Sequence, residues 1–222
     1  MNPDDERRRS ERETEPAPPT DRAGTDLRIG SVFAGHRVEA ELGRGGMGVV
    51  YRARHTALDR DRALKVIAAD LASDERFRAR FSRESRLAAS IEHPNVIPVH
   101  HAGEESGRPY LSMRIVDGPD LGALVGEQGP LDPRRVADIV AQVAGGLDAA
   151  HERGLVHRDV KPANVLVEGA AGAERAYVTD FGISRLRATE TSVTTTGEFL
   201  GTADYVAPEQ IRGDAVDHRA DV

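Results

Sequence analysis

The pattern of apolar residues changes character part-way along the chain. Over residues 31–113, short segments rich in β-branched residues alternate with glycines and turns, and only 73–91 repeats with a helical period. Beyond residue 118 the longest regular pattern is helical and covers 133–153. Strands first and helices afterwards predict an α+β chain, in which a small antiparallel sheet with one main helix lies apart from a mainly helical region.

Five segments of the first part are candidate strands. They are HRVEAELG (36–43), GVVYRARH (48–55), RALKVIAA (62–69), VIPVHHAGEE (96–105) and PYLSMRIV (109–116). The helix predicted over 73–91 places Phe77, Phe81, Ala88 and Ile91 on one face, which should pack on the sheet. The five arginines of this helix are interpreted as a solvated face.

The second part contains clear signals for helix boundaries. Asp132 can cap a helix that has Pro133 at its first position, and Gly154 is a suitable stop. Two short strands, NVLVE and AYVTD, should form a hairpin around the loop GAAGAER. The threonine-rich segment 183–206 has no clear period and is predicted to be a loop.

Composition excludes several classes of protein. The net charge of −7 offers no general attraction to nucleic acid. The absence of cysteine excludes a disulfide framework and fits a reducing compartment, so we expect a cytoplasmic domain. This stretch contains no apolar run long enough to cross a membrane.

Residues 1–28 are charged and proline-bearing and are expected to be a disordered leader. The alternative is a docking or phosphorylation tail through Ser10, Thr14 or Thr20.

A glycine-rich segment, ELGRGGMGVVY, lies between the first two predicted strands. Gly43, Gly45 and Gly48 fit G-x-G-x-x-G, and glycine lets a backbone approach a phosphate because no Cβ stands in the way. By itself the pattern also fits an ordinary glycine-rich hairpin. A dinucleotide-binding fingerprint should open a helix, whereas a strand follows here, as in the phosphate-covering loop of protein kinases.

Only two of the 30 basic residues are lysine, namely Lys65 and Lys161. Lysine is a compact point charge and arginine a planar fork, so a site that needs one ammonium at one atom cannot exchange them freely. Lys65 lies in a short apolar strand, where a buried ammonium needs a carboxylate. Glu84 is the predicted partner, because Asp74 and Glu75 sit in the first turn and suit the helix dipole. The alternative is that Glu84 is a surface acid.

The octapeptide HRDVKPAN (157–164) carries the most specific chemistry. Asp159 can orient an attacking hydroxyl and accept its proton, Lys161 can reach a transferring phosphate, and Asn164 offers an amide oxygen to a metal ion. Sixteen residues after Asn164 comes DFG, in which the carboxylate of Asp180 is a hard-oxygen ligand suited to Mg²⁺. The segment GTADYVAPEQ closes the loop that begins at Asp180.

In this order the motifs resemble a eukaryotic-like (Hanks-type) bacterial serine/threonine protein kinase. The resemblance implies a bilobal protein-kinase-like fold, with ATP as phosphoryl donor, Mg²⁺ or Mn²⁺ as cofactor, and serine or threonine hydroxyls of proteins as acceptors. Its expected parts are a leader (1–28) and a kinase domain (29–222), the latter divided into an N-lobe (31–113), a hinge (114–118) and a partial C-lobe (119–222).

The same resemblance assigns roles to residues. The catalytic residues would be Asp159, Lys161, Lys65 and Glu84, and the metal ligands Asn164 and Asp180. The nucleotide site would comprise Leu42, Gly43, Gly45, Gly48, Val50, Ala63, Lys65, Met113 as gatekeeper, Arg114 and Val116. His157 and Phe181 would belong to the hydrophobic spine that joins the lobes. Arg114 stands where the family commonly has an acid, which should alter nucleotide contacts.

Lys161 and Thr202 follow the serine/threonine pattern of the family rather than the tyrosine pattern. By the same resemblance, Arg158 would meet a phosphothreonine of the activation segment, and we expect autophosphorylation at Thr194 and Thr196. The alternative is a polar loop without a regulatory site. The resemblance also suggests a homodimer through the N-lobe, and a full-length protein anchored in a membrane by a region outside this stretch.

Two other functions are compatible with some of these motifs. A pseudokinase-like nucleotide-binding scaffold would normally lack Lys65, Asp159 or Asp180, and all three are present. A small-molecule phosphotransferase should lack the threonine-rich segment and the triplet APE, and both are present.

Asp221 matches the aspartate that opens a central C-lobe helix and holds the catalytic loop, but the rest of that helix is absent. We therefore expect a catalytic domain truncated in the C-lobe, or an inactive fragment of a kinase.

Overall fold

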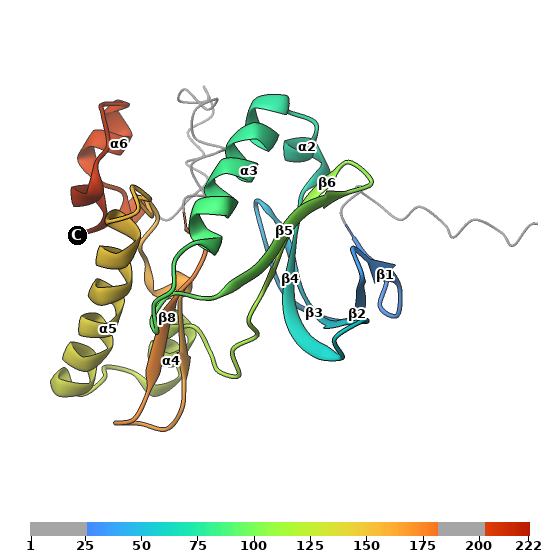
Figure 1. The fold of residues 1–222 in the computed structure, drawn as a ribbon. Helices are drawn as coiled ribbons and strands as arrows, with labels where there is room; N and C mark the ends of the chain where they lie inside the picture. The colour runs from blue at the N-terminus through green and yellow to red at the C-terminus, as the bar shows by residue number, and fades with distance from the viewer. Residues whose placement is uncertain (1–25, 182–202) are drawn as a thin grey trace, which may run out of the picture.

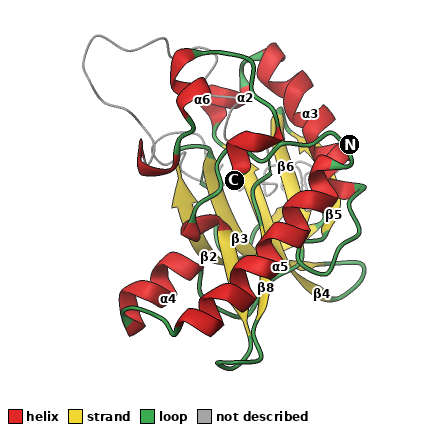
Figure 2. Ribbon diagram, turned by 90° about the vertical axis from the view of Figure 1, so that its left-hand side faces the viewer, coloured by secondary structure: helices red, strands yellow, loops and turns green. Residues whose placement is uncertain are grey.

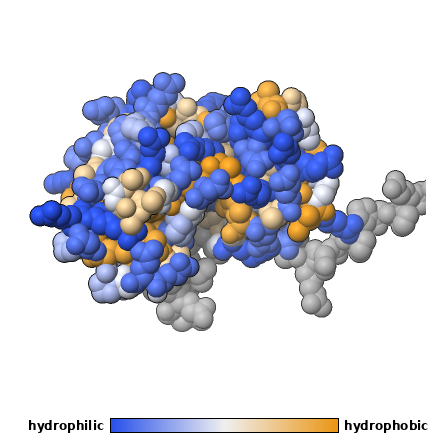
Figure 3. Space-filling view, turned by 90° about the horizontal axis from the view of Figure 1, so that it is seen from below, coloured by the Kyte–Doolittle hydropathy of each residue, from blue (hydrophilic) through white to orange (hydrophobic). Residues whose placement is uncertain are grey.

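The chain folds into two parts, an N-lobe built on strands and a C-lobe dominated by helices (Figure 1). The computed structural model describes residues 26–181 and 203–222. Seen from below, a notch separates two rounded masses, on which hydrophilic and hydrophobic residues are mixed (Figure 3). The predicted α+β segregation is therefore confirmed.

The N-lobe contains a six-stranded antiparallel sheet with the spatial order β1-β2-β3-β4-β6-β5. Its strands are β1 (Val32–Phe33), β2 (His36–Gly45), β3 (Gly48–His55), β4 (Arg60–Ile67), β5 (Val99–Glu105) and β6 (Arg108–Met113). Each of the five predicted strands is present, with boundaries that differ by about three residues or less. The two-residue strand β1 was not predicted, because it is too short to show alternation.

Strand β4 is buried on both faces, and this fixes the direction of its lysine. Leu64 and Val66 pack in the core on one side of the sheet. Ala63 and Ile67 pack on the other side, together with the phenylalanines of helix α3. Because side chains alternate along a strand, Lys65 points to the same side as α3.

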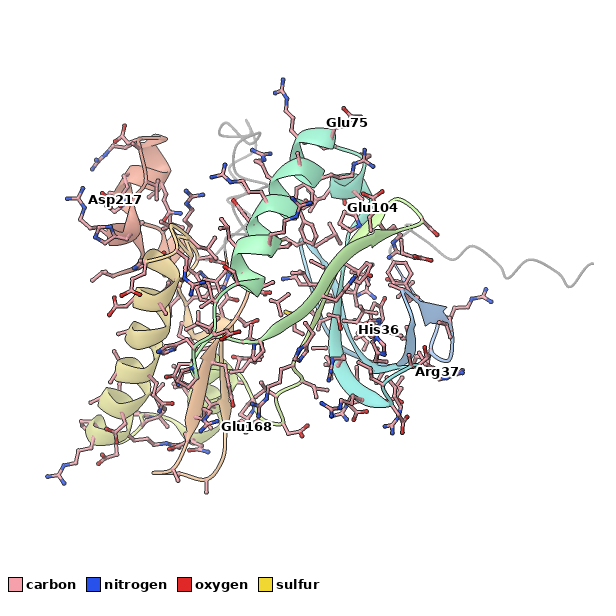
Figure 4. All side chains as sticks on the ribbon, viewed as in Figure 1. His36, Arg37, Glu75, Glu104, Glu168 and Asp217 are labelled. Carbon is pink, nitrogen blue, oxygen red and sulfur yellow. The ribbon has the colours of Figure 1, made fainter. Side chains whose placement is uncertain are left out.

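Helix α3 (Glu75–Ala89) follows the short helix α2 (Ala69–Ala72) and covers that side of the sheet. Asp74 caps α3 by accepting a hydrogen bond from a backbone N–H of its first turn. Phe77 and Phe81 are stacked, with ring centroids 6.2 Å apart, and both are buried as predicted. The first turn of α3 lies beside the end of β5, where Figure 4 labels Glu75 and Glu104.

The C-lobe has one long helix packed along a small hairpin. Its elements are α4 (Leu121–Gln128), α5 (Pro133–His151), β7 (Val165–Glu168), β8 (Arg175–Val178), α6 (Pro208–Arg212) and the 3-10 turns Pro162–Asn164, Ala203–Tyr205 and His218–Asp221. Helix α5 lies along β8 (Figure 2) and is capped by Asp132, as predicted. Helix α4 was not predicted, because eight residues with two glycines carry only a weak helical period.

A short connection before β5 joins the two lobes. Ile97 N–H donates to the carbonyl of Val178 at 3.0 Å, and Val178 N–H donates to the carbonyl of Asn95 at 2.8 Å. The amide nitrogen of Asn95 also donates to Gln142 on α5 at 2.9 Å. One apolar cluster continues from the end of α3 through this connection to α5 and Phe181. The N-lobe is therefore fixed to the C-lobe close to DFG.

Candidate active site

The loop between α5 and β7 holds the carboxylate of Asp159 in one orientation. Its two oxygens accept hydrogen bonds from Nζ of Lys161 at 3.1 and 2.9 Å. The amide nitrogen of Asn164 donates to Oδ2 of Asp159 at 3.0 Å and to its backbone carbonyl at 2.7 Å. The side chain of Asp159 is still 27% exposed, so a substrate can reach the oriented carboxylate. Three of the predicted residues are thus brought together.

Asp221 anchors the backbone of this loop from a distant position in the sequence. Its side chain is 0% exposed and accepts hydrogen bonds from the backbone N–H groups of His157 (2.7 Å) and Arg158 (2.6 Å) and from Nε2 of His151 (2.7 Å). Arg158 has a φ of 67°, a left-handed conformation that costs a residue other than glycine about 1 kcal/mol. The hydrogen bonds to Asp221 offset this strain, in agreement with the role that the resemblance gave this aspartate.

His157 connects the loop to the DFG segment through both ring nitrogens. Nε2 donates to the carbonyl of Thr179 at 2.8 Å, and Nδ1 accepts from the N–H of Asp159 at 3.2 Å. This pattern requires the neutral tautomer with the proton on Nε2. The ring also packs on Phe181, with centroids 4.8 Å apart, and Phe181 in turn packs with Ala88 of α3. His157 and Phe181, which the resemblance placed in one spine, are therefore in contact.

The buried histidines should make the protein less stable in mild acid. Burial lowers the pKa of His157 below its ordinary 6.5, although Thr179 and nearby carboxylates oppose the change. Burial also lowers the pKa of His36 and of His100. The unfolded chain then binds protons more tightly than the folded one, so this contribution is complete above pH 6.5 and is lost as the pH falls through the folded pKa.

Urea unfolding between pH 7.5 and 5.0 measures this loss. We expect the free energy of unfolding to fall with decreasing pH, by up to about 1.4 kcal/mol per pH unit for each histidine. His157→Gln, which can still donate to Thr179, should flatten the profile. Identical slopes for the protein and His157→Gln would contradict the assignment.

Lys65 forms its ion pair with Asp180. The ammonium, whose side chain is 7% exposed, lies 2.6 Å from Oδ1 of Asp180. Burial by itself raises the pKa of Asp180, but the ammonium of Lys65, helped by His157 and Lys161, outweighs burial and holds that pKa below its usual range. Asp180 is therefore a charged carboxylate at neutral pH.

The structure corrects the pairing that was predicted for Lys65. Within the described residues, its ion pair is to Asp180 and not to Glu84. The left-handed backbone of Asp180, with φ of 65°, brings its carboxylate to the ammonium. A buried ammonium is stabilised by the carboxylate that comes nearest, and sequence spacing could not tell which one this would be.

The glycines of the β2–β3 hairpin have different reasons to be glycine. A Cβ on Gly48 would lie 2.0 Å from the carbonyl oxygen of Val66, and the φ of Gly48 is 146°. The fold itself therefore requires glycine there. A Cβ on Gly43 or Gly45 would meet no described atom within 4 Å. These two glycines leave open space above β2, which fits the close approach of a ligand.

The apolar residues predicted for the nucleotide site gather around one cluster. Ala63 and Met113 belong to the buried core beside α3, and Val50 and Val116 are partly buried against it. Leu166 on β7 packs against the same cluster from the C-lobe, and it was not predicted. Alternation along β7, which buries the neighbours of Leu166 within the C-lobe, was the signal that could have found it. Leu42 is half exposed on β2.

The side chain of Arg114 turns to the C-lobe hairpin. Its guanidinium donates to Oε2 of Glu168 at 2.9 Å and lies 4.9 Å from the ring centroid of Tyr177. The hydroxyl of Tyr177 donates to the same oxygen of Glu168 at 3.2 Å. Figure 4 labels Glu168 on this hairpin. Arg114 thus connects the end of the N-lobe to β7 and β8, a role that the sequence did not indicate.

Asn164 and Asp180 fit a magnesium ion only in part. Thr179 N–H donates to the carbonyl of Asn164 at 3.0 Å, which sets Asp180 next to that residue. Both hydrogen bonds of the Asn164 side chain use its nitrogen, so its amide oxygen is the atom that can bind a cation. Among the described residues, no three histidine or acidic side chains are grouped to hold a metal. Phosphate oxygens and water would therefore have to complete the six ligands.

Some predictions fall outside the part of the chain that the structure describes. These are most of the leader (1–25) and the phosphorylation sites Thr194 and Thr196, together with Thr202. Of the segment GTADYVAPEQ, residues 203–210 are described, and Gln210 on α6 donates to the carbonyl of Arg158 at 2.9 Å. The APE segment therefore contacts the catalytic loop.

Comparison with known proteins identifies this arrangement. Residues 36–222 match the family model described as protein kinase domain. The chain belongs to the protein kinase domain family. The solved structure of the PknI kinase domain from Mycobacterium tuberculosis resembles it with a TM-score of 0.72 at 39% identity, over 88% of this chain and 73% of that one. The predicted bilobal kinase fold is confirmed.

Curated relatives of this kinase domain are serine/threonine-protein kinases of mycobacteria. PknJ of Mycobacterium tuberculosis is 46% identical over 198 residues, which are 89% of this chain and 33% of PknJ. PknH of Mycobacterium bovis is 43% identical over 197 residues, which are 89% of this chain and 32% of PknH. The chain thus spans about a third of the length of these relatives. Within the described residues, no helix has the length and apolar character needed to cross a membrane.

Proposed function

We propose that the protein is a serine/threonine protein kinase that transfers the γ-phosphoryl group of ATP to serine or threonine hydroxyls of proteins. The observation that carries this proposal is the group of Asp159, Lys161 and Asn164, joined by short hydrogen bonds and set next to the pair of Lys65 and Asp180. A carboxylate, two ammonium groups and two cation ligands at one place are what phosphoryl transfer requires.

Asp159 would orient the attacking hydroxyl and accept its proton. Its carboxylate is fixed by Lys161 and Asn164 before any substrate arrives, so little reorganisation is needed when the hydroxyl binds. The side chain of Lys161 is 22% exposed, and its ammonium would stabilise charge on the transferring group as a point charge. The names of the mycobacterial relatives and the lysine at position 161 support serine and threonine as acceptors.

The hairpin of β2 and β3 and the apolar cluster would hold the nucleotide. Gly43 and Gly45 would let the backbone approach the phosphates, and the cluster around Met113 would receive the adenine. When bound, Mg²⁺ or Mn²⁺ would neutralise charge on the phosphates, and Asn164 and Asp180 are the residues that would hold it. Lys65 would exchange Asp180 for the phosphate oxygens when the nucleotide binds, and Glu84 would be its partner on α3.

Regulation and partners of the whole protein are part of the same proposal. Thr194 and Thr196 would be autophosphorylated, and Arg158 would bind the phosphothreonine. The kinase domain would be cytoplasmic and would dimerise through the N-lobe, and the full-length protein would be anchored in a membrane by a region outside this stretch. These features rest on the resemblance to the bacterial branch of the family.

Incubation with Mg²⁺ and ATP labelled on the γ-phosphate, with casein as a generic acceptor, tests the proposal. We expect label on phosphoserine and phosphothreonine but not on phosphotyrosine, and peptide mass spectrometry should find phosphate on Thr194 and Thr196. Chelation of the cation with EDTA should abolish transfer. ATP labelled on the α-phosphate is the control and should leave the proteins unlabelled. Binding of ATP without any transfer would instead support the nucleotide-binding scaffold.

Alanine at two glycines should separate a structural from a binding role. Gly48→Ala should lower the free energy of unfolding by about 1–3 kcal/mol, because its Cβ clashes with the carbonyl of Val66 in a strained backbone. Gly45→Ala meets no described atom, so stability should change by less than about 0.5 kcal/mol. Its KM for ATP should rise several-fold. Equal destabilisation by both substitutions, measured by urea unfolding, would refute this distinction.

A further inference from the structure

A basic groove lies between helix α3 and the turn that follows α5, and none of the candidate active-site residues lines it. It has a volume of about 540 Å³ and is lined by residues of α3 and by the turn that follows α5. Three arginines line it, Arg83 and Arg86 from α3 and Arg153 from the C-lobe. Arg153 donates to the backbone carbonyl of Ser90, so the two sides of the groove are joined at one end.

The charge of this groove contrasts with that of the molecule. The chain has a net charge of −7, yet α3 carries five arginines in 15 residues. Arg78 is offset by Glu104 at 3.5 Å. In contrast, none of the ion pairs within the described residues involves Arg83, Arg86 or Arg153, and all three side chains are exposed. The positive charge of the groove is thus left for a partner from outside.

We propose that this groove binds a phosphorylated peptide segment of a partner protein, with the phosphate of a phosphoserine or phosphothreonine held by Arg83, Arg86 and Arg153. A phosphate monoester carries a charge of about −1.5 to −2 at neutral pH and three acceptor oxygens, which match guanidinium forks. Ala79 and Leu87 add apolar surface to the lining, which a neighbouring side chain of the peptide could contact. Nucleic acid is disfavoured, because the surrounding net charge is negative and the arginines form a groove rather than a track.

The groove joins the two lobes, which gives its occupant a defined position. Arg83 and Arg86 lie on one face of α3, one turn apart, and Arg153 lines the same groove from the turn that follows α5. A single phosphate between them would therefore contact both lobes. Arginine is suited to this task, since its planar fork can bind two oxygens of one phosphate at once.

Fluorescence anisotropy with the protein and two labelled pools of nine-residue peptides tests the proposal. One pool has a fixed central phosphoserine, and the other has serine there. The test variant combines Arg83→Gln, Arg86→Gln and Arg153→Gln. The control combines Arg60→Gln, Arg76→Gln and Arg134→Gln, which remove the same charge from exposed positions outside the groove. The assay measures binding alone, so its outcome does not depend on the proposed phosphoryl transfer.

We expect the phosphoserine pool to bind at least tenfold more tightly than the serine pool, and binding to weaken as salt is added. The test variant should lose at least tenfold in affinity and the control less than twofold. The single variant Arg86→Lys, which keeps the charge, should lose less affinity than Arg86→Gln, so a loss from misfolding is distinguishable. Equal binding of both pools, equal loss in test and control variants, or tighter binding of a single-stranded oligonucleotide would overturn the proposal.

Discussion

Replacement of Asp159 by asparagine is expected to lower kcat for phosphoryl transfer by about 10³-fold, because a general acid or base typically accelerates a reaction by roughly 10² to 10⁴-fold. The amide has nearly the shape of the carboxylate, but it cannot accept the proton of the substrate hydroxyl. It also loses the charge that Lys161 binds at 2.9 and 3.1 Å. Steady-state kinetics with a protein acceptor and Mg-ATP measures the change.

The affinity for ATP should separate a chemical defect from a structural one. Asp159 lies on the catalytic loop, whereas the glycines and the apolar cluster of the proposed nucleotide site lie mainly on the N-lobe sheet. We therefore expect KM for ATP to stay within about threefold of that of the unmodified protein, because the substitution leaves the contacts that bind ATP unchanged. Retention of more than a tenth of kcat would show that Asp159 is not the proton acceptor.

Asp221→Asn is expected to destabilise the protein by about 3 kcal/mol. Separating a buried charged group from its partners typically costs about 3–5 kcal/mol. The buried carboxylate accepts three hydrogen bonds, from the backbone at His157 and Arg158 and from the ring of His151. The amide nitrogen of asparagine would face donors that it cannot satisfy. For a chain of this size the melting temperature should fall by about 6–12 °C.

The same substitution should also disturb catalysis from a distance. When Arg158 loses the hydrogen bond that holds its left-handed backbone, Asp159 is free to shift, and a displacement of about 1 Å can cost 10²-fold in rate. Asp217→Asn is the matched control, because Asp217 caps the same turn but its side chain is half exposed and pairs with Arg219 on the surface. Similar losses for both variants would indicate that the turn, rather than the buried carboxylate, is responsible.

The sequence predicted those parts of the fold that depend on neighbouring residues. Alternation located β2, β3 and β4, and the Asp132–Pro133 pair gave the start of α5. These signals act through side chains and caps within a few residues, so they survive in a single sequence. Elements with little periodicity of their own were missed, as α4 shows. That helix is stabilised by its cap at Asp120 and by packing against β7 and the 3-10 turn Pro162–Asn164.

By itself the sequence determined which chemical groups the site would hold, because the motifs around Asp159 and Asp180 fix residue types at fixed spacings. Only the tertiary structure decided how those groups are paired. Lys65 and Asp180 are 115 positions apart, and Asp221 lies 64 positions from the histidine whose backbone it holds. Contacts at such separations depend on how two lobes pack, and hydrophobic packing is not directional. The groove between α3 and Arg153 arises in the same way, from a helix and a turn that meet only after folding.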